Sequence, residues 1–226
     1  MAVRGRPRSF DRDAALAQAM SLFWAKGYEA TQLADLMAAM KINPPSFYAA
    51  FGSKEQLFRE AVELYLATRG AGSMKALAET AHARDAIQAM LLASADIALA
   101  SPSRGGCLVS LGLVNCQSQN LPLREHMRAL RRETVALIHQ RLAQGVVEGE
   151  LPAGLDVPRT ATYYAMVMQG LSLQAQDGAS AEELAGIVAT AMSALDQDQA
   201  SASKPAGRTG GSTKKQGAAA RGRRRP

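Results

Sequence analysis

Long hydrophobic runs and disulfide patterns are both missing from this sequence. Its longest apolar stretches are interrupted by Gly, Ser or Asn before they reach membrane-spanning length, and no apolar segment follows the basic start. Two cysteines in a chain of 226 residues do not make a disulfide framework. We therefore expect a protein without a membrane segment, in the reducing cytoplasm.

Residues that carry enzyme chemistry are equally sparse. The chain has no Gly-rich phosphate loop, no HExxH motif and no GxSxG motif. Its three histidines, His82, His126 and His139, are scattered, and the two that share a predicted helix are too far apart to bind one metal ion. The sequence therefore predicts no catalytic residue, no metal site, no cofactor and no enzyme activity.

Positive charge is concentrated at the two ends of the chain. The formal charge is +6, but residues 1–56 carry a net +2, residues 57–203 a net −4 and residues 204–226 a net +8. Arg4, Arg6 and Arg8 lie on a basic arm, residues 1–9, which has no helical period. Such an arm can follow a DNA backbone or enter a minor groove, or it can be simply solvated.

The pattern of apolar residues predicts helices throughout, because alternation of β-branched residues is almost absent. One helix is expected from Asp11 to Gly27, where glycine supplies the stop. The next, residues 33–40, follows Thr31, whose hydroxyl is placed to cap the first amides.

A very short helix is expected after a tight turn at Lys41. Asn43 is a good N-cap, Pro44 stands at the first helical position, and Gly52 ends the helix. Ser53 then opens the following helix, with Gln56 three residues on in a capping box.

The body is expected to begin after a glycine-rich linker at residues 70–72. Apolar periodicity predicts helices at about 84–100, 107–116, 122–148 and 158–176, and a last one that Ser180 and Glu183 open as a capping box. After Asp198 the composition changes to Ala, Ser, Gly, Lys and Arg, so residues 199–226 are expected to be a disordered basic tail. The tail is either a second electrostatic anchor on DNA or a solubilising segment.

Two short helices joined by a tight turn suit a unit that binds the DNA major groove. The residues KINPPSFYAAFGSKEQLF, preceded by FWAKGYEATQLADLM, closely resemble the DNA-binding domain of the TetR/AcrR family of one-component repressors. The resemblance extends from about Asp11 to Tyr65, and beyond that it is one of architecture only. It implies an all-α protein with an N-terminal three-helix helix-turn-helix domain, residues 10–56, followed by a helical ligand-binding and dimerisation domain, residues 57–198.

The resemblance also implies roles for individual residues of the helix-turn-helix. The residues implied to face DNA bases are Pro45, Ser46, Ala49 and Ala50, and Pro44, at the start of the short helix, is also implied to belong to the DNA-binding surface. Thr31, Tyr48 and Lys54 are implied to hold phosphates. Since the alanines replace larger polar residues often found there, thymine methyl contacts and DNA shape must carry more of the specificity.

Two further sites are expected in the body. In proteins that resemble this one, the last two helices pair with those of a second copy as a four-helix bundle, here through Met168, Leu171, Leu184, Ile187, Val188 and Ala191. The residues alone leave an intramolecular core as an equal alternative. A soft-walled ligand cavity is expected around Met90, Leu111, Met127, Tyr163 and Met166, with ordinary packing as the alternative.

A redox or metal sensor would need the two cysteines to lie close together. On one helix, Cys107 and Cys116 would lie about 13 Å apart along the axis, so a disulfide between them requires the helix to break. The sequence favours buried, inert thiols.

These features together predict a ligand-responsive repressor that binds double-stranded DNA at a palindromic operator as a homodimer. An unidentified small molecule would release it. One alternative is a nucleoid-type architectural protein without a ligand, which predicts weak sequence preference and steep salt dependence. Another is a ligand-binding protein or enzyme that has lost operator recognition, which the intact Thr31, Tyr48 and Lys54 disfavour.

Overall fold

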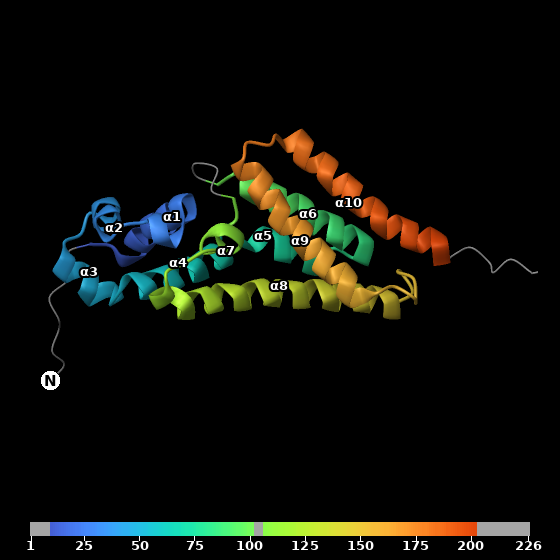
Figure 1. Ribbon diagram of the computed structural model, residues 1–226, viewed down its shortest axis with the longest axis horizontal. Helices are drawn as coiled ribbons and strands as arrows, with labels where there is room; N and C mark the ends of the chain where they lie inside the picture. The colour runs from blue at the N-terminus through green and yellow to red at the C-terminus, as the bar shows by residue number, and fades with distance from the viewer. Residues whose placement is uncertain (1–9, 102–105, 203–226) are drawn as a thin grey trace, which may run out of the picture.

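The computed structural model describes residues 10–101 and 106–202, and every regular element in these two ranges is helical (Figure 1). The elements are α1 (Arg12–Ala30), α2 (Leu33–Met40), α3 (Pro44–Phe51), α4 (Lys54–Ala67), α5 (Ala71–Glu79), α6 (Ala83–Leu99), α7 (Leu108–Leu111), the 3₁₀ turn η2 (Ser118–Asn120), α8 (Leu121–Val147), α9 (Val157–Gln176) and α10 (Ala181–Ala202). The predicted all-α fold is confirmed. The arm with Arg4, Arg6 and Arg8 and the tail beyond residue 202 lie outside the described residues.

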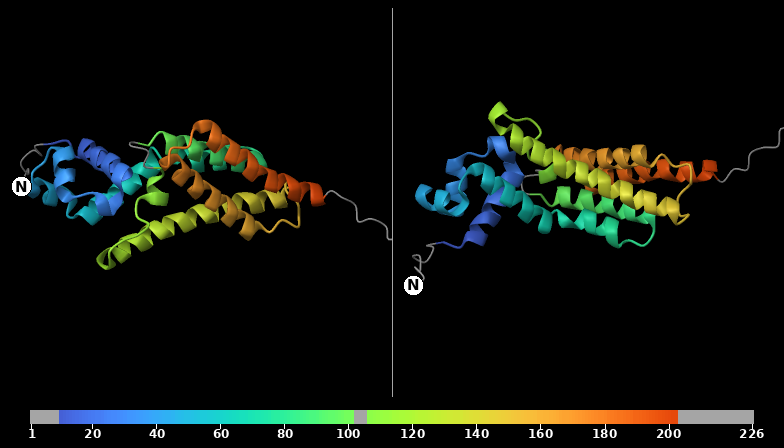
Figure 2. Two further views of the ribbon diagram at one scale, coloured as in Figure 1. Left: turned by 45° about the horizontal axis from the view of Figure 1, so that its top comes forward. Right: turned by 90° about the horizontal axis from the view of Figure 1, so that it is seen from below.

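The helices form two lobes. Helices α1, α2 and α3 make a small head at one end, and α5 to α10 make an elongated body (Figure 1). Helix α4 runs from the head towards the body, and the long α8 extends along the body (Figure 2). The last described residues of α10 lie at the end of the body far from the head (Figures 1 and 2).

The two lobes contain two hydrophobic cores, and one of these joins the head to the body. One lies wholly in the body and includes Ile87, Leu91 and Tyr164. The other begins in the head around Phe23 and Phe58 and continues without a break to α7 and the first half of α8. Because α4 contributes its buried face to this second core, the head is packed against the body rather than tethered to it.

The structure corrects two predictions about secondary structure in the body. The segment expected to be a linker, residues 70–72, instead opens α5, for which Gly70 is the N-cap residue. The helix expected at residues 107–116 is reduced to the single turn α7, which ends at Gly112. A Cβ atom at Gly112 would lie 2.4 Å from the carbonyl oxygen of Leu108, so this position requires glycine.

Helix capping follows the sequence at most positions. Ser180 and Glu183 form the reciprocal capping box that the sequence predicts, with each side chain accepting a bond from the other residue's backbone N–H. Thr31 is different. Its hydroxyl donates to the carbonyl of Gly27 at 2.6 Å, and α2 starts at Gln32 without a side-chain cap, so the predicted Thr31 cap is wrong.

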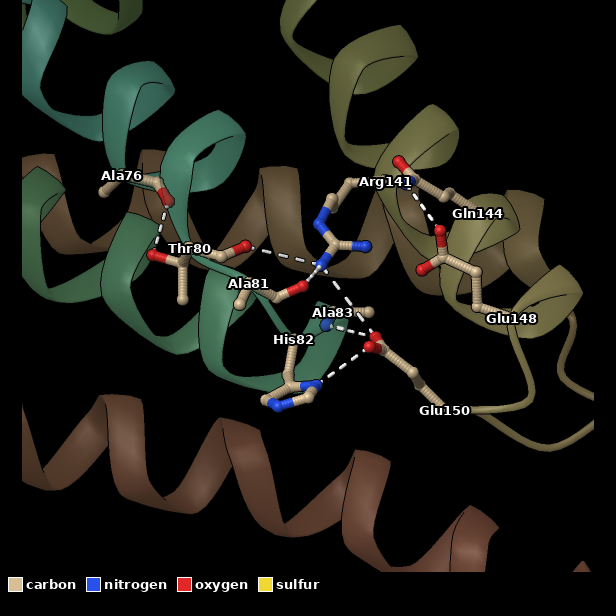
Figure 3. Close-up of polar contacts among 9 residues, drawn as sticks. All are labelled: Ala76, Thr80, Ala81, His82, Ala83, Arg141, Gln144, Glu148 and Glu150. Atoms are coloured by element: carbon tan, nitrogen blue, oxygen red, sulfur yellow. Dashed lines mark hydrogen bonds and ion pairs between the residues drawn. The ribbon is translucent and has the colours of Figure 1, made fainter.

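A polar clamp closes the end of the body that lies away from the head (Figure 3). The carboxylate of Glu150, in the α8–α9 connection, accepts bonds from the backbone N–H of Ala83 at 2.6 Å and from the ring of His82 at 2.9 Å. Arg141 of α8 lies 3.9 Å from the same carboxylate and donates to the carbonyl of Ala81 at 2.6 Å. The clamp therefore ties the start of α6 to the end of α8. Glu150 accepts from an N-terminal amide of α6, which the side chain of the N-cap residue His82 does not cap.

The clamp contains one group that titrates near neutral pH. Hydrogen bonding to Glu150 raises the pKa of His82, Asp85 adds to this, and Arg141 and desolvation oppose it. Because the pKa of His82 is raised in the folded state, its interaction with Glu150 contributes fully to stability below about pH 6.5, the ordinary histidine value. This contribution is lost as pH rises through the raised pKa.

We expect Glu150→Gln to lower the melting temperature by roughly 3 °C at neutral pH, because an amide oxygen accepts from Ala83 less strongly than a carboxylate does and forms no ion pair with Arg141. The deficit should be larger at pH 6 than at pH 9, since the bond to protonated His82 is lost as well. Thermal unfolding followed by circular dichroism measures both. Glu148→Gln is the control, because Glu148 is exposed and contacts only Gln144 of its own helix among the described residues. Equal melting temperatures for the two variants would contradict the clamp.

Candidate nucleic-acid interface

Helices α2 and α3 are joined by the tight turn that the sequence predicts. Lys41 has a left-handed backbone, with φ of 56°, and donates its N–H to the carbonyl of Ala38. The side chain of Asn43 accepts from the N–H of Ser46 at 2.9 Å, which caps α3 as expected. Gly52, with φ of 71°, ends α3 after about two turns.

Helix α3 has one buried face and one open face. Phe47 and Phe51 are fully enclosed in the head core. The opposite face carries the predicted DNA-facing residues, of which Pro44, Pro45 and Ala49 are exposed and Tyr48 is 53% exposed. Ser46 and Ala50 are half-buried beside them. Four residues named from the sequence, Pro44, Pro45, Tyr48 and Ala49, thus share one short, outward-facing surface, with Ser46 and Ala50 at its edge.

The three predicted phosphate-binding residues do not share this exposure. Tyr48 is open, whereas Thr31 is 0% exposed and its hydroxyl is bonded to Gly27, so the structure contradicts a phosphate contact for Thr31. Lys54 stands at the first turn of α4, and its ammonium lies 4.1 Å from the ring centroid of Tyr28. Burial lowers the pKa of Lys54, and Glu29 opposes this.

Arg12 is a residue of this site that the sequence did not reveal. Its guanidinium donates to the carbonyl of Ala50 at 3.2 Å, pairs with Glu60 at 2.7 Å and lies 4.7 Å above the ring of Phe51. One side chain at the start of α1 therefore holds the end of α3 and the middle of α4. Only the charge of Arg12 is visible in the sequence, and its partners are 38 to 48 residues away.

The head is bonded to the body through the segment 106–120, which we call the α7 segment. Trp24 donates its indole N–H to the carbonyl of Gly106 at 2.6 Å, and the N–H of Tyr28 donates to the carbonyl of Gly112 at 2.8 Å. The carboxylate of Glu29 accepts from the backbone N–H of Gln117 and from the side chain of Asn120. The last turns of α1 are thus tied along the length of the α7 segment.

An apolar cavity of about 180 Å³ lies on the other side of the α7 segment. Its walls come from α4, α5, α8 and α9 as well as from α7, and a smaller chamber of about 30 Å³ continues inward from it. Residues that line both spaces are Tyr65, Gly70, Ser73, Cys107, Ser110 and Met168. Its mostly apolar wall and its volume suit a small molecule.

None of the five residues predicted for a ligand pocket lines this cavity. Met90 and Met127 are fully buried in two different cores, and Leu111 is half-buried without facing it. Tyr163 and Met166 lie instead at an open depression on the surface of α9. The predicted set therefore differs from the lining of this cavity, because periodicity identifies a helix's apolar face but not which faces leave a space between them.

Most residues predicted for a dimer interface are buried within one copy of the chain. Leu171, Leu184, Val188 and Ala191 belong to the body core and are at most 2% exposed, so they offer no surface to a partner. Met168 lines the cavity. Of the predicted set only Ile187, 38% exposed, is open, and it is joined by Met166 and Leu173 of α9, which the sequence did not assign to the interface.

The cysteines and the acidic residues form no metal centre. Cys107 and Cys116 are free thiols of intermediate exposure, flanking α7 rather than sharing a helix, and the hydroxyl of Tyr65 donates to the Cys107 sulfur at 3.4 Å. Within residues 10–101 and 106–202, no three His, Cys, Asp or Glu side chains gather where they could hold a metal ion. In the same ranges no helix combines the length and the hydrophobicity needed to cross a membrane.

Comparison with known proteins gives matches over both lobes. Residues 15–61 match the family described as "Bacterial regulatory proteins, tetR family", and residues 83–191 match "Tetracyclin repressor-like, C-terminal domain". The transcriptional repressor ComR of Escherichia coli is 34% identical over 191 residues, covering 84% of this chain and 90% of that protein. The repressor BdcR of the same organism is 29% identical over 197 residues, covering 85% and 93%.

Solved structures give the same result. The regulator CifR, in a cysteine mutant complexed with 26-bp double-strand operator DNA, is 40% identical with a TM-score of 0.80 and covers 84% of this chain and 100% of that one. A regulator from Chloroflexus aurantiacus is 28% identical with a TM-score of 0.71, covering 83% and 94%.

We expect Arg12→Met to lower the free energy of unfolding by about 1–2 kcal/mol, because the carbonyl of Ala50 and the carboxylate of Glu60 each lose a partner. Amides of α3 should also exchange with deuterium faster, since the end of that helix loses its bond to α1. Urea unfolding and hydrogen exchange measure these effects. Arg59→Met is the control, because Arg59 only pairs with Glu55 one turn away on α4 and should change stability by about 0.5 kcal/mol or less. Comparable losses in the two variants would contradict the proposed role of Arg12.

Proposed function

Because the chain belongs to the tetR family of bacterial regulatory proteins, we propose that it represses transcription as a dimer that binds a palindromic operator and is released by a small molecule. It is a transcriptional regulator and not an enzyme. The observation that carries the proposal is the open face of α3, with Tyr48, Pro45 and Ala49 presented outward on a helix anchored by Phe47 and Phe51. Since DNA is the partner, we expect the protein in the bacterial cytoplasm.

The proposed division of labour on DNA follows from exposure and chemistry. The hydroxyl of Tyr48 and the first turn of α4, with Lys54, would hold phosphates, because free amides and the helix dipole favour anions there. Ser46, Pro45 and Ala49 would meet base edges. With only one hydroxyl and small apolar groups available, thymine methyls and DNA shape would carry much of the specificity. The bound operator of CifR supports this choice of partner.

A dimer interface is proposed on the exposed faces of α9 and α10. Met166, Leu173 and Ile187 are large apolar side chains with 61%, 47% and 38% of their surface open to water. Gly170 and Gly186 lie on the same two helices, and a Cβ atom at either would meet nothing within 4 Å in a single copy. Apolar side chains beside glycines allow two helices to approach closely, which supports pairing with a second copy.

Release by a ligand is proposed to act through the α7 segment. One side of this segment forms the cavity wall at Cys107 and Ser110, and the other side accepts hydrogen bonds from Trp24 and Tyr28 of the head. A ligand that shifts the segment would therefore move α1, and with it the recognition helix α3. Two heads held at the wrong separation no longer match successive major grooves, about 34 Å apart.

We expect Tyr48→Phe to weaken binding to selected and to random DNA by a similar factor, about fivefold, because a phosphate contact positions the protein without specifying sequence. Ser46→Ala should instead lower the ratio of specific to random binding. The operator is obtained by sequencing genomic fragments that the purified protein retains, and affinities are measured by fluorescence anisotropy at fixed salt. Equal losses for Ser46→Ala on both DNAs would remove it from base contacts. Failure of the wild type to select any fragment would favour an architectural DNA-binding protein.

We expect Ile187→Glu to convert dimers to monomers, because it would bury an unpaired charge in the proposed interface. Analytical ultracentrifugation measures the mass. Leu92→Glu is a matched control, since Leu92 of α6 has the same 38% exposure but lies on another helix. An intact dimer in the Ile187 variant, or dissociation in the Leu92 variant, would locate the interface elsewhere.

A further inference from the structure

The cavity under the α7 segment contains a cation, Arg131, that forms no ion pair with a carboxylate of the described residues. Arg131 of α8 lines the cavity and donates from Nη1 to the carbonyl of Val109, another lining residue, at 3.0 Å. Within the described residues Arg131 makes no ion pair within 4.0 Å, although Arg128 and Arg59 on nearby exposed surfaces both do. Burial lowers the pKa of Arg131, which means that removing this charge from water destabilises the folded protein.

The surroundings of Arg131 favour a singly charged anion with an apolar body. The guanidinium can still offer Nε and Nη2, a planar pair of donors that matches a carboxylate. The hydroxyl of Tyr65 donates to the Cys107 sulfur, a weak acceptor, and interacts with the backbone of Leu108, and its proton can turn from the sulfur to a carboxylate oxygen. Most of the remaining wall is apolar, with Leu130, Val109 and Met168 among its members. A phosphate dianion would lack a second cation here, because the other charged residue of the wall is Glu133.

The volume limits the size of the ligand. An apolar cavity of about 150 Å³ holds benzene. The main cavity, about 180 Å³, therefore suits a single ring or a short alkyl chain with one carboxylate. Its inner chamber adds the hydroxyls of Ser73, Ser94 and Ser110, which are buried and can accept or donate one further bond.

We infer that this site binds a small monocarboxylate, with the carboxylate held by Arg131 and Tyr65 and the apolar body enclosed by α5, α8 and α9. The inference rests on the proposed ligand response and specifies its chemistry. The ligand would also act on the head, since Arg131 holds Val109 in the helical turn of the α7 segment. A carboxylate that draws the guanidinium away from Val109 acts directly on the segment that bonds to Trp24 and Tyr28.

The test uses benzoate and its neutral isostere benzamide as probes of the full-length protein in isothermal titration calorimetry. We expect benzoate to bind at least tenfold more tightly than benzamide. Arg131→Gln, which keeps a donor for Val109, should remove the preference, and Arg131→Lys should restore part of it. The matched control is Arg132→Gln, because Arg132 is exposed, loses the same charge and does not line the cavity. Glu133→Gln should strengthen benzoate binding by removing the opposing charge.

The fluorescence of Trp24 reports on ligand binding at the same site. Trp24 is the only tryptophan, and its ring lies 5.1 Å from that of Tyr65 in the cavity wall, so benzoate binding should change its fluorescence. Far-ultraviolet circular dichroism spectra and cooperative melting curves show whether the Arg131 variants are folded. Equal affinity for the two probes, no binding of either, or an unchanged preference in Arg131→Gln would each overturn the inference.

The outcomes also separate this inference from the proposed function. A protein that binds its selected operator but shows no preference for benzoate contradicts only the ligand class. A protein that binds benzoate through Arg131 and stays on the operator supports the site and contradicts ligand release. Binding of benzoate that lowers operator affinity in the wild type but not in Arg131→Gln supports both.

Discussion

The contact between the end of α1 and the α7 segment is the constraint on which the rest of this structure depends. Gly27 adopts a φ of 71°, which redirects the chain so that the N–H of Tyr28 reaches the carbonyl of Gly112 at 2.8 Å. A Cβ atom at Gly27 would lie 3.0 Å from that carbonyl oxygen. Two glycines from distant parts of the chain therefore meet backbone to backbone, and larger residues would separate head from body.

This contact explains why the two lobes share one hydrophobic core. Once α1 is fixed to the α7 segment, Phe23 and Trp24 pack on α4, and Phe58 and Tyr65 of α4 carry the packing onward to Leu108. Cores of this kind transmit strain because they are close-packed and deform in few ways. A change in the cavity beside Tyr65 is thus felt in the head, whereas a flexible linker at residues 70–72 would have absorbed it.

Two arginines of α8, Arg141 and Arg131, have different partners. At the far end of the body, the carboxylate of Glu150 pairs with both Arg141 and His82 and ties α6 to α8, although Nη1 of Arg141 has no hydrogen-bond partner within the described part of the chain. Beside the α7 segment, Arg131 has only a neutral backbone partner among the described residues. A charge that is satisfied stabilises the native state, and a charge left incomplete in a cavity favours a ligand that completes it. The contrast between Arg141 and Arg131, on the same helix, therefore separates structure from proposed recognition.

The sequence by itself determined the helical class, the turn at Lys41, the Asn43 cap, the outward residues of α3 and the family, because these depend on neighbours within a few positions. It did not reveal α5, the break after Leu111, the bonds of Arg12 or the cavity, and it assigned Thr31, Leu184 and Met90 to surfaces they do not reach. Only the tertiary structure decided these, since a periodic apolar face is the same in sequence whether it packs on its own chain, on a second copy or around a ligand. Which of those occurs depends on contacts between residues as far apart as Trp24 and Gly106, and no local pattern encodes them.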